Sequence, residues 1–397
     1  MDMKKMKSKK RADGEGTLYQ KPDGTWVGQI TIGYDPVTGK QKRRTFYGKT
    51  KAEVVKKMNE VLVDLERGTY IEPTNITLGN WIREWLDDRK PHLTESTYNV
   101  YEMLIRVHIE PVLGDVTLKN LQTRRIQKLL NEKFTNGRVD GKGGLSSRTV
   151  KYIHQALNGC LSQAVKERII SFNPAEYCEL PKQEVNDIRV FSHEELQRFL
   201  QIAEKESQHF PAFYLSISTG LRRGELLGLT WDDIDFENYS ININKQLVRS
   251  KKDGLVFKSL KTKKSKRRIK VDNTAIAVLK NHKTKQSKTK LSLGEIYQDN
   301  NLIFCTDIGM PLEPRNFNRH FYMLVKKAKI PHTRLHDLRH LYATIAIESG
   351  VDLKIVSSIL GHSSVRLTGD IYAHLTDKMQ DEAVAKVSTV IAECIKK

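Results

Sequence analysis

The chain has 397 residues, which is too long for one ordinary domain and predicts roughly two or three. Its hydrophobic content of 39% is enough to bury real cores and excludes global disorder. A net charge of +20 at pH 7 argues against an enzyme of neutral metabolites and favours a nucleic-acid partner, because Lys and Arg release counterions from phosphate backbones.

Residues 1–12 form a basic tail that we expect to be disordered when the protein is free. No apolar segment follows this tail, so it does not resemble a signal peptide, and no run of residues approaches a membrane span. The four cysteines are scattered, without a CxxC pair or the spacing of a zinc site. We therefore expect a cytoplasmic protein with reduced thiols and no membrane partner.

Residues 13–72 predict a small β-sheet followed by a helix. Turn signals at Pro22–Gly24 and Asp35–Gly39 separate runs in which apolar and polar residues alternate, as in a three-stranded meander. Thr50 is placed to cap the helix, and Glu53 three residues later is placed to complete a capping box.

The same module carries a basic cluster beside an alternating strand. A solvated basic hairpin is the simpler interpretation, but the net charge favours a β-ribbon laid into a DNA groove, with Gln29 and Thr31 on its exposed face. The candidate DNA contacts of this module are Trp26, Gln29, Thr31, Lys40, Lys42, Arg43 and Arg44.

Residues 75–175 predict an all-helical bundle, and residues 176–189, which lack periodicity, predict a linker. The expected helix caps are Thr94 and Ser146, and the expected stop of the second helix is Pro111 with Gly114. Near the start of the last helix, Arg148, Lys151 and Tyr152 are candidate phosphate contacts, although most lysines on helix surfaces are only solvated.

Residues 190–397 predict a mainly helical domain that begins at the N-cap Ser192. Strands after Trp231 predict a small antiparallel sheet in which Lys261 lies at the tip of a hairpin, and a helix from about Thr376 follows. The predicted fold class is therefore multidomain α+β. It combines a three-stranded sheet plus helix, an all-α bundle, and a mainly α domain with a small antiparallel sheet.

This last domain contains side chains suited to attack on a phosphodiester. Such a reaction needs a nucleophile, charge stabilisation on the phosphoryl oxygens and a proton for the leaving oxygen. Arg222 and Arg339 can supply bidentate bonds to those oxygens, and Glu225 is placed one helical turn from Arg222 to hold its guanidinium. Taken singly, either arginine would more often be a surface or salt-bridge residue.

Two histidines accompany the arginines. His336 precedes Arg339 by one helical turn, where its imidazole can accept the nucleophile's proton or bind the phosphate. His362 follows a predicted helix end at Gly361, a suitable position for a second phosphate donor. Each histidine alone would more often be an ordinary core or surface group.

A lysine and a tyrosine complete the set. Lys261 can protonate the leaving oxygen, although Lys263 and Lys264 compete for that role. Tyr372 is one of 14 tyrosines, and only its place after a glycine-histidine turn distinguishes it. Its phenol can form a phosphodiester that still leaves readily, as reversible cutting and resealing requires.

Neither the acidic clusters of two-metal nucleases nor a GxxxxGK[ST] loop occurs in the sequence. We therefore expect chemistry without a metal, ATP or any other cofactor. The energy of the broken phosphodiester would then be conserved in a covalent intermediate.

The segments TGLRRGE, LHDLRH, LGHSS and IYAH closely resemble the boxes of tyrosine recombinases, specifically phage-type and conjugative-transposon integrases. The resemblance implies that Tyr372 is the nucleophile that forms a 3′-phosphotyrosyl link. It further implies that Arg222, Arg339, His336 and His362 hold the phosphate, that Lys261 protonates the 5′ oxygen and that Glu225 supports the pocket.

The resemblance also implies a bacterial, nucleoid-associated enzyme whose partner is double-stranded DNA. Residues 13–72 would bind arm sites, residues 75–175 would bind core sites, and residues 190–397 would be catalytic. Four protomers, joined through the C-terminal helix, would pass through a Holliday junction while integrating and excising a mobile element. Excisionase and DNA-bending proteins are candidate accessory partners.

Two positions depart from the usual boxes: Leu341 stands where threonine is common, and Gly369 stands where leucine is frequent. Gly369 lowers helix propensity just before Tyr372. The competing hypotheses are a non-catalytic DNA-binding regulator on the same fold, a type IB-like topoisomerase and a recombinase that resolves replicon dimers. An intact pocket argues against the first of these, and the separate arm-binding module argues against the other two.

Overall fold

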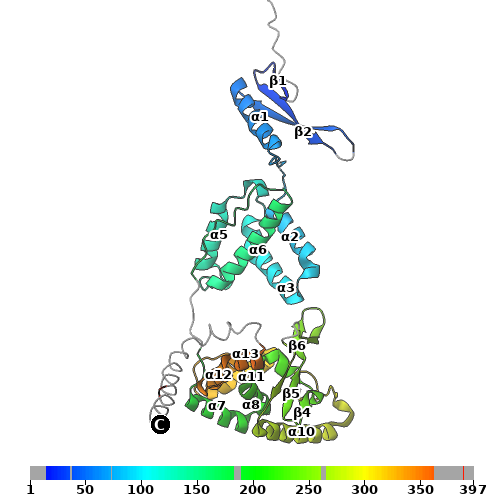
Figure 1. Cartoon of the computed structure of the whole chain (residues 1–397), viewed down its shortest axis with the longest axis vertical. Coiled ribbons are helices and arrows are strands. Elements are labelled where there is room, and N and C mark those ends of the chain that lie inside the picture. Colours follow the sequence, from blue (N-terminus) through cyan, green and yellow to red (C-terminus); the bar gives the residue numbers. More distant parts are fainter. Residues whose placement is uncertain are drawn as a thin grey trace, which may run out of the picture. The chain divides into compact units, whose positions relative to one another are not determined.

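The computed structural model describes residues 15–35, 38–72, 74–182, 189–260 and 265–361, together with residue 388. The chain divides into two compact units, Met1–Glu184 and Val185–Lys397, and each is described by itself (Figure 1). The division lies inside the predicted linker.

The first unit begins with the predicted meander. Strands β1 (Thr17–Gln20), β2 (Trp26–Tyr34) and β3 (Gln41–Gly48) form an antiparallel sheet in the order β1-β2-β3, and helix α1 (Lys51–Glu66) packs against it. The predicted three-stranded sheet with one helix is therefore confirmed.

Helix α1 packs closely on the sheet at Gly28. A Cβ atom at Gly28 would lie 2.2 Å from the Met58 Sδ atom, so only glycine fits beneath the helix there. At the start of α1, Thr50 accepts a bond from the Glu53 N–H, as predicted. The Glu53 carboxylate, however, binds the N–H of Lys49 at 3.1 Å rather than that of Thr50, so the capping box is displaced by one residue.

The rest of the first unit is a helical bundle around a separate core. Its elements are α2 (Leu78–Arg89), η1 (Lys90–His92), α3 (Glu95–Leu104), the π-helical turn η2 (Ile105–Ile109), α4 (Glu110–Leu113), η3 (Leu118–Asn120), α5 (Thr123–Asn136) and α6 (Ser147–Lys166). Thr94 and Ser146 cap α3 and α6 through their hydroxyl groups, as predicted.

The second helix passes through Pro111 rather than stopping there. Proline lacks an N–H and its ring crowds the carbonyl group four residues earlier. The wider π-helical turn over Ile105–Ile109 comes directly before this position, and the helical path then continues as α4 to Leu113. The helix ends at Leu113 with Gly114 as its C-cap, so the predicted stop at Gly114 is confirmed, and Pro111 lies in the last turn.

The predicted linker begins as a segment bound to the bundle. The side-chain amide of Gln127 on α5 accepts a bond from the Glu179 N–H at 2.8 Å and donates one to the Glu179 carbonyl at 3.0 Å. Ala175 is fully buried, and its carbonyl lies 2.8 Å from His154 Nε2. These contacts fix the chain well after the last helix of the bundle.

The second unit is mainly helical, as predicted (Figure 1). Its helices are α7 (His193–Glu206), α8 (Phe210–Thr219), α9 (Arg223–Leu227), η4 (Trp231–Asp233), α10 (Asn273–Leu293), η5 (Gly294–Ile296), α11 (Pro314–Lys327), α12 (Asp337–Glu348) and α13 (Leu353–Leu360). Four fully or almost fully buried phenylalanines from α7, α8 and α11 pack together in its core: Phe199, Phe213, Phe317 and Phe321. Ser192 caps α7 in a complete capping box with Glu195.

The strands of the second unit form two small sheets. Strands β4 (Ile234–Asp235), β5 (Ser240–Ile243) and β8 (Arg267–Lys270) make one, and β6 (Lys245–Ser250) pairs with β7 (Gly254–Ser259) in the other.

This topology corrects one prediction. Because β7 pairs with β6 and β8 pairs with β5, the segment that carries Lys261 connects strands of two different sheets. It is not the tip of a hairpin between β7 and β8. The alternating pattern identified the strands, but pattern alone does not determine which strands pair.

Candidate active site

The two predicted arginines meet at the C-terminal end of α13. Arg339, on α12, donates to the carbonyl oxygens of Gly220 at 2.9 Å and Leu360 at 2.7 Å. Arg222, at the start of α9, donates to the carbonyl oxygen of Gly361 at 3.2 Å. Although 117 positions separate the two arginines in the sequence, the fold brings both to consecutive carbonyl groups of one helix end. These groups have no partner within the helix.

The two arginines differ in their access to solvent. Arg339 is only 3% exposed, whereas the Arg222 side chain is 37% exposed and can reach a bound phosphate. Helix α12, which carries Arg339, packs against both α8 and α13, so the site is built on packed helices.

Glu225 holds Arg222, as predicted. Its Oε1 accepts from Arg222 Nη1 at 2.9 Å and its Oε2 accepts from the Arg222 N–H at 3.0 Å. The carboxylate is 1% exposed and also receives both Nη groups of Arg267, at 3.2 and 2.9 Å. Sequence reasoning did not single out Arg267, although it shares strand parity with the buried Ile269 and so belongs on the inner face of β8.

The charges of the two arginines keep Glu225 ionised. Burial alone would raise the pKa of this carboxyl group, but the hydrogen bond and charge of Arg267, followed by those of Arg222, outweigh burial. The pKa of Glu225 therefore lies below its ordinary value of 4.5. The site contains an arginine–glutamate–arginine triad in which only Arg222 has a large exposed fraction.

His336 immediately precedes α12, and the Arg339 N–H donates to its carbonyl oxygen at 3.1 Å. Although the His336 side chain is exposed at the surface, partial desolvation by the protein packed around it, followed by the charge of Arg339, lowers the pKa of His336 below its ordinary 6.5. At neutral pH the ring is therefore uncharged and can accept a proton. His340 packs edge-on to it, with ring centroids 5.4 Å apart.

The remaining predicted catalytic residues, Lys261, His362 and Tyr372, lie outside the described residues, as do Lys263, Lys264 and Gly369. The described chain ends beside two of them. Leu260 donates its N–H to the Asn244 carbonyl, and Gly361 binds Arg222 as above. Leu341, the other departure from the usual boxes, is buried in the core below α12 and does not alter the arginine cluster.

The candidate DNA contacts of the N-terminal module lie on two different faces of its sheet. Gln29, Thr31 and Arg43 have the strand parity opposite to that of Ile30 and Phe46, so they lie on the face away from α1. Gln29 is bonded to Thr45 across this face, at 3.3 Å.

Trp26 and Arg44 lie on the other face. Trp26 packs against the core of the module, and the Arg44 guanidinium stacks on the rings of Phe46 and Tyr70. Lys40 is exposed in the loop before β3, and Lys42 is exposed beside Glu72 at 3.5 Å.

On α6, Arg148, Lys151 and Tyr152 form an exposed group in the first two turns. The Arg148 guanidinium lies over the Tyr152 ring, and its Nε–H donates to the Tyr152 hydroxyl at 3.3 Å. This stacking holds the cation in place at the surface.

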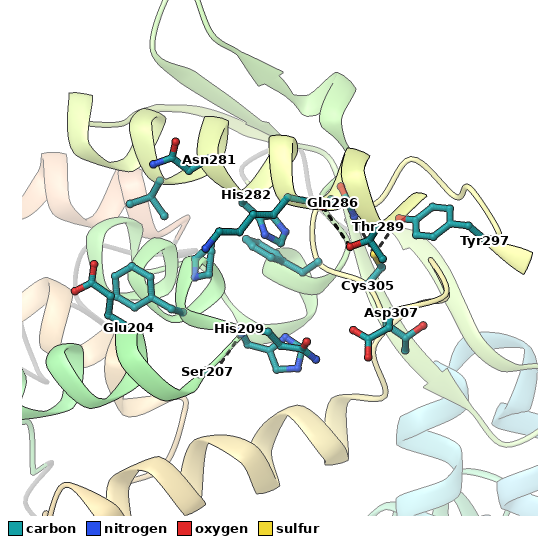
Figure 2. A pocket seen from close by; sticks show the side chains of 17 residues that line it. Glu204, Ser207, His209, Asn281, His282, Gln286, Thr289, Tyr297, Cys305 and Asp307 are labelled. Atoms are coloured by element: carbon teal, nitrogen blue, oxygen red, sulfur yellow. Dashed lines mark hydrogen bonds between the residues drawn. The ribbon is translucent and has the colours of Figure 1, made fainter. Parts of the chain in front are cut away.

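A pocket of about 370 Å³ lies elsewhere in the second unit, between the end of α7 and helix α10 (Figure 2). Two of its polar side chains are bound to nearby backbone carbonyl groups: Gln286 Nε2 donates to the Leu302 carbonyl at 2.9 Å, and His282 Nε2 lies 2.7 Å from the Ile303 carbonyl. Burial, followed by the charge of His320, lowers the pKa of His209 in this pocket to about 4. Neither Arg222 nor Arg339 lines it, so it is not part of the arginine site.

No helix in the described part of the chain is long and apolar enough to cross a membrane. Within the same residues, no group of three or more His, Cys, Asp or Glu side chains is arranged to hold a metal ion.

Comparison with known proteins decides the family. Residues 189–379 match the phage integrase family, and residues 77–134 match the N-terminal SAM-like domain of phage integrases. A protein described as "Tyrosine recombinase XerC-like", from Caldanaerobacter subterraneus subsp. tengcongensis, is 31% identical over 378 residues, which cover 89% of this chain and 93% of that protein. The chain belongs to the phage integrase family of tyrosine recombinases.

This tyrosine recombinase shares its fold with two solved integrases. The Tn1549 transposon integrase, in complex with a circular intermediate DNA, matches with a TM-score of 0.66 and 22% identity, covering 78% of this chain and 99% of that one. A lambda integrase tetramer bound to a Holliday junction matches with a TM-score of 0.51 and 23% identity, covering 87% and 95%. The predicted resemblance and fold class are both confirmed. As a tyrosine recombinase, the protein is a site-specific integrase that cuts and rejoins DNA strands.

Proposed function

We propose that this integrase moves a mobile element by metal-free transesterification in the pocket of Arg222 and Arg339. The Tyr372 phenol oxygen attacks the scissile phosphorus, the bond from phosphorus to the 5′ oxygen breaks, and a 3′-phosphotyrosyl link forms. The reverse reaction with another strand's 5′-hydroxyl reseals the DNA and releases the tyrosine. The observation that carries this proposal is the convergence of Arg222, held by Glu225, and Arg339 on the carbonyl groups that end α13, directly before His362 in the sequence.

Each side chain has a role that its chemistry supports. The two arginines bind the non-bridging oxygens, where negative charge accumulates in the pentacoordinate state. His336 accepts the phenol proton, and His362 donates a hydrogen bond to the phosphate. Lys261 protonates the leaving 5′ oxygen, with Lys263 and Lys264 as the alternatives on the same segment.

The other modules would hold the DNA. Residues 13–72 bind arm sites through the open face of the sheet, and residues 75–175 bind core sites, with Arg148, Lys151 and Tyr152 at the backbone. Four protomers, linked through the C-terminal helix, join two duplexes and form a Holliday junction. The lambda integrase, which shares the fold, is a tetramer bound to a Holliday junction in its complex. Excisionase and DNA-bending proteins direct the outcome, and the reaction takes place on the nucleoid in the bacterial cytoplasm.

The pH dependence of cleavage should test the role of His336 as the base. Because the pKa of His336 lies below 6.5, its ring stays neutral at that pH, and the rate of adduct formation should fall only in more acidic buffer, as protonation removes the base. Single-turnover rates measured from pH 5 to 8 report this decrease on the acid side, and the decrease should be absent in His336→Gln. A wild-type midpoint above 6.5 would contradict the assignment.

The two neighbouring arginines of β3 should behave differently. Arg43→Ala removes an exposed cation from the open face, so arm-site affinity should fall and the slope of log K against log salt should decrease by about 1. Arg44→Ala removes a cation that stacks on Phe46 and Tyr70, so it should mainly lower the melting temperature of the module. Equal effects of both changes on the salt slope would argue against the open face as the DNA surface.

The experiment that tests the function uses a suicide duplex that carries the element's end and is nicked near the cleavage position. In EDTA and without ATP, the wild-type protein should form a covalent protein–DNA adduct and then transfer the strand to a second duplex. Tight binding without an adduct would favour the regulator. Cleavage and relaxation without strand transfer would favour a topoisomerase, and activity confined to replicon-dimer sites would favour a dimer resolvase.

A further inference from the structure

Arg267 contacts three segments that lead directly to predicted catalytic residues. Its two Nη groups bind both oxygens of Glu225, and its Nε–H donates to the carbonyl oxygen of Ile359 near the end of α13. Its Nη1 also donates to the carbonyl oxygen of Ser265 at 3.1 Å. These bonds use all three side-chain nitrogens, so Arg267 acts on its neighbours rather than on a phosphate. Its side chain is 7% exposed.

Each of these partners adjoins the reaction pocket. Glu225 holds the exposed Arg222. Ile359 begins a run of three consecutive carbonyl groups, 359 to 361, that bind Arg267, Arg339 and Arg222 in turn, and His362 is the next residue in the sequence. Ser265 directly follows residues 261–264, which include Lys261.

Gly361 shows how tightly this junction is packed. Its φ is +65°, in the left-handed region that favours glycine, and a Cβ atom there would lie 3.0 Å from Arg267 Nη1. The end of α13 therefore rests on the guanidinium of Arg267, and a change in one displaces the other.

We propose that Arg267 is a positioning residue of the recombination reaction, which fixes Arg222 through Glu225 and fixes the end of α13 that precedes His362. This inference rests on the proposed function. Arg222 is partly exposed, and a phosphate ligand displaced by about 1 Å can lose about 10²-fold in rate. Arg267 would prevent this displacement before DNA binds.

The test is Arg267→Lys, which keeps the charge but replaces the planar fork by a single ammonium group. We expect adduct formation on the suicide duplex to slow by about 10²-fold with unchanged core-site affinity. The matched control is Arg268→Lys, the next residue, whose 52% exposed side chain binds Asp235 and Ser240 on the other face of β8. This control should cleave at the wild-type rate.

A charge-neutral substrate separates positioning from general damage. If the scissile phosphate is replaced by a methylphosphonate, less negative charge needs stabilising, so a misplaced Arg222 matters less. The defect of Arg267→Lys should then shrink to about tenfold or less. A defect that is equally large on both substrates would mean that Arg267 only maintains the fold, and would overturn the inference.

A second variant covers the case in which Arg267→Lys does not fold. In Glu225→Met/Arg267→Met, apolar side chains replace the buried ion pair, a change that often leaves stability intact. We expect a folded, DNA-binding protein that cleaves slowly because Arg222 is no longer held. Wild-type cleavage by this variant would also overturn the inference. If the wild-type protein itself formed no adduct, the proposed function would fail first.

Discussion

Tyr372→Phe should abolish the covalent adduct while leaving DNA binding intact. The change removes one oxygen atom, which is the only atom of the side chain that can bond to phosphorus. In the proposed function His336 takes the phenol proton and the arginines bind the phosphate, so neither is assigned to attack phosphorus in place of the tyrosine. We expect the rate of adduct formation to fall by about 10⁴-fold or more, as for loss of other enzymatic nucleophiles. Single-turnover gels on the suicide duplex measure it.

The matched control is Tyr342→Phe. Tyr342 lies beside the same pocket, since a Cβ atom at Gly220 would approach its ring to 2.9 Å, and burial raises the pKa of its phenol. A buried, protonated phenol is a poor nucleophile, so Tyr342→Phe should still form the adduct. If Tyr372→Phe formed the adduct and Tyr342→Phe did not, the nucleophile would be misassigned.

The sequence predicts the elements of this protein better than their contacts. Helix caps such as Thr94 and Ser146, and the alternating strands of the N-terminal sheet, depend on a few neighbouring residues, so local patterns suffice. Pairing of β5 with β8 across 23 intervening residues depends on tertiary packing, and the sequence therefore misplaced Lys261 at a hairpin tip. The capping box of α1 deviates by only one residue, and the helix that passes Pro111 ends at the predicted Gly114.

In the candidate site, too, local patterns predicted the residues better than the contacts that tertiary packing creates. Arg222, Glu225, His336 and Arg339 were predicted from side-chain chemistry and motif order, and the structure brings them to one helix end or its immediate neighbourhood. Arg267 was missed because it stands in a run of lysines and arginines that reads as a solvated strand. Its burial arises only when β8 meets the end of α13, a contact between residues 92 positions apart.

Glu225→Gln should strongly destabilise the second unit. The amide keeps the shape of the side chain but removes the negative charge between Arg222 and Arg267, so a cation that is 7% exposed loses its counter-ion. Breaking a buried ion pair by removing one partner costs about 3–5 kcal/mol. Urea unfolding monitored by circular dichroism measures this loss, and cleavage should fall as well because Arg222 is released.

The pH dependence identifies the source of that loss. The folded-state pKa of Glu225 is below 4.5, so its contribution to the unfolding free energy is fully present above pH 4.5 and is lost as the pH falls through the folded-state pKa. The loss of stability in Glu225→Gln should therefore be largest at neutral pH, and its unfolding free energy should fall less steeply than that of wild type as the pH is lowered.

The control, Asp235→Asn, breaks the more exposed pair with Arg268 and should cost less than about 1 kcal/mol. Equal losses in both variants would mean that the buried triad adds nothing beyond a surface ion pair. The rigidity that we ascribe to the pocket would then need another source.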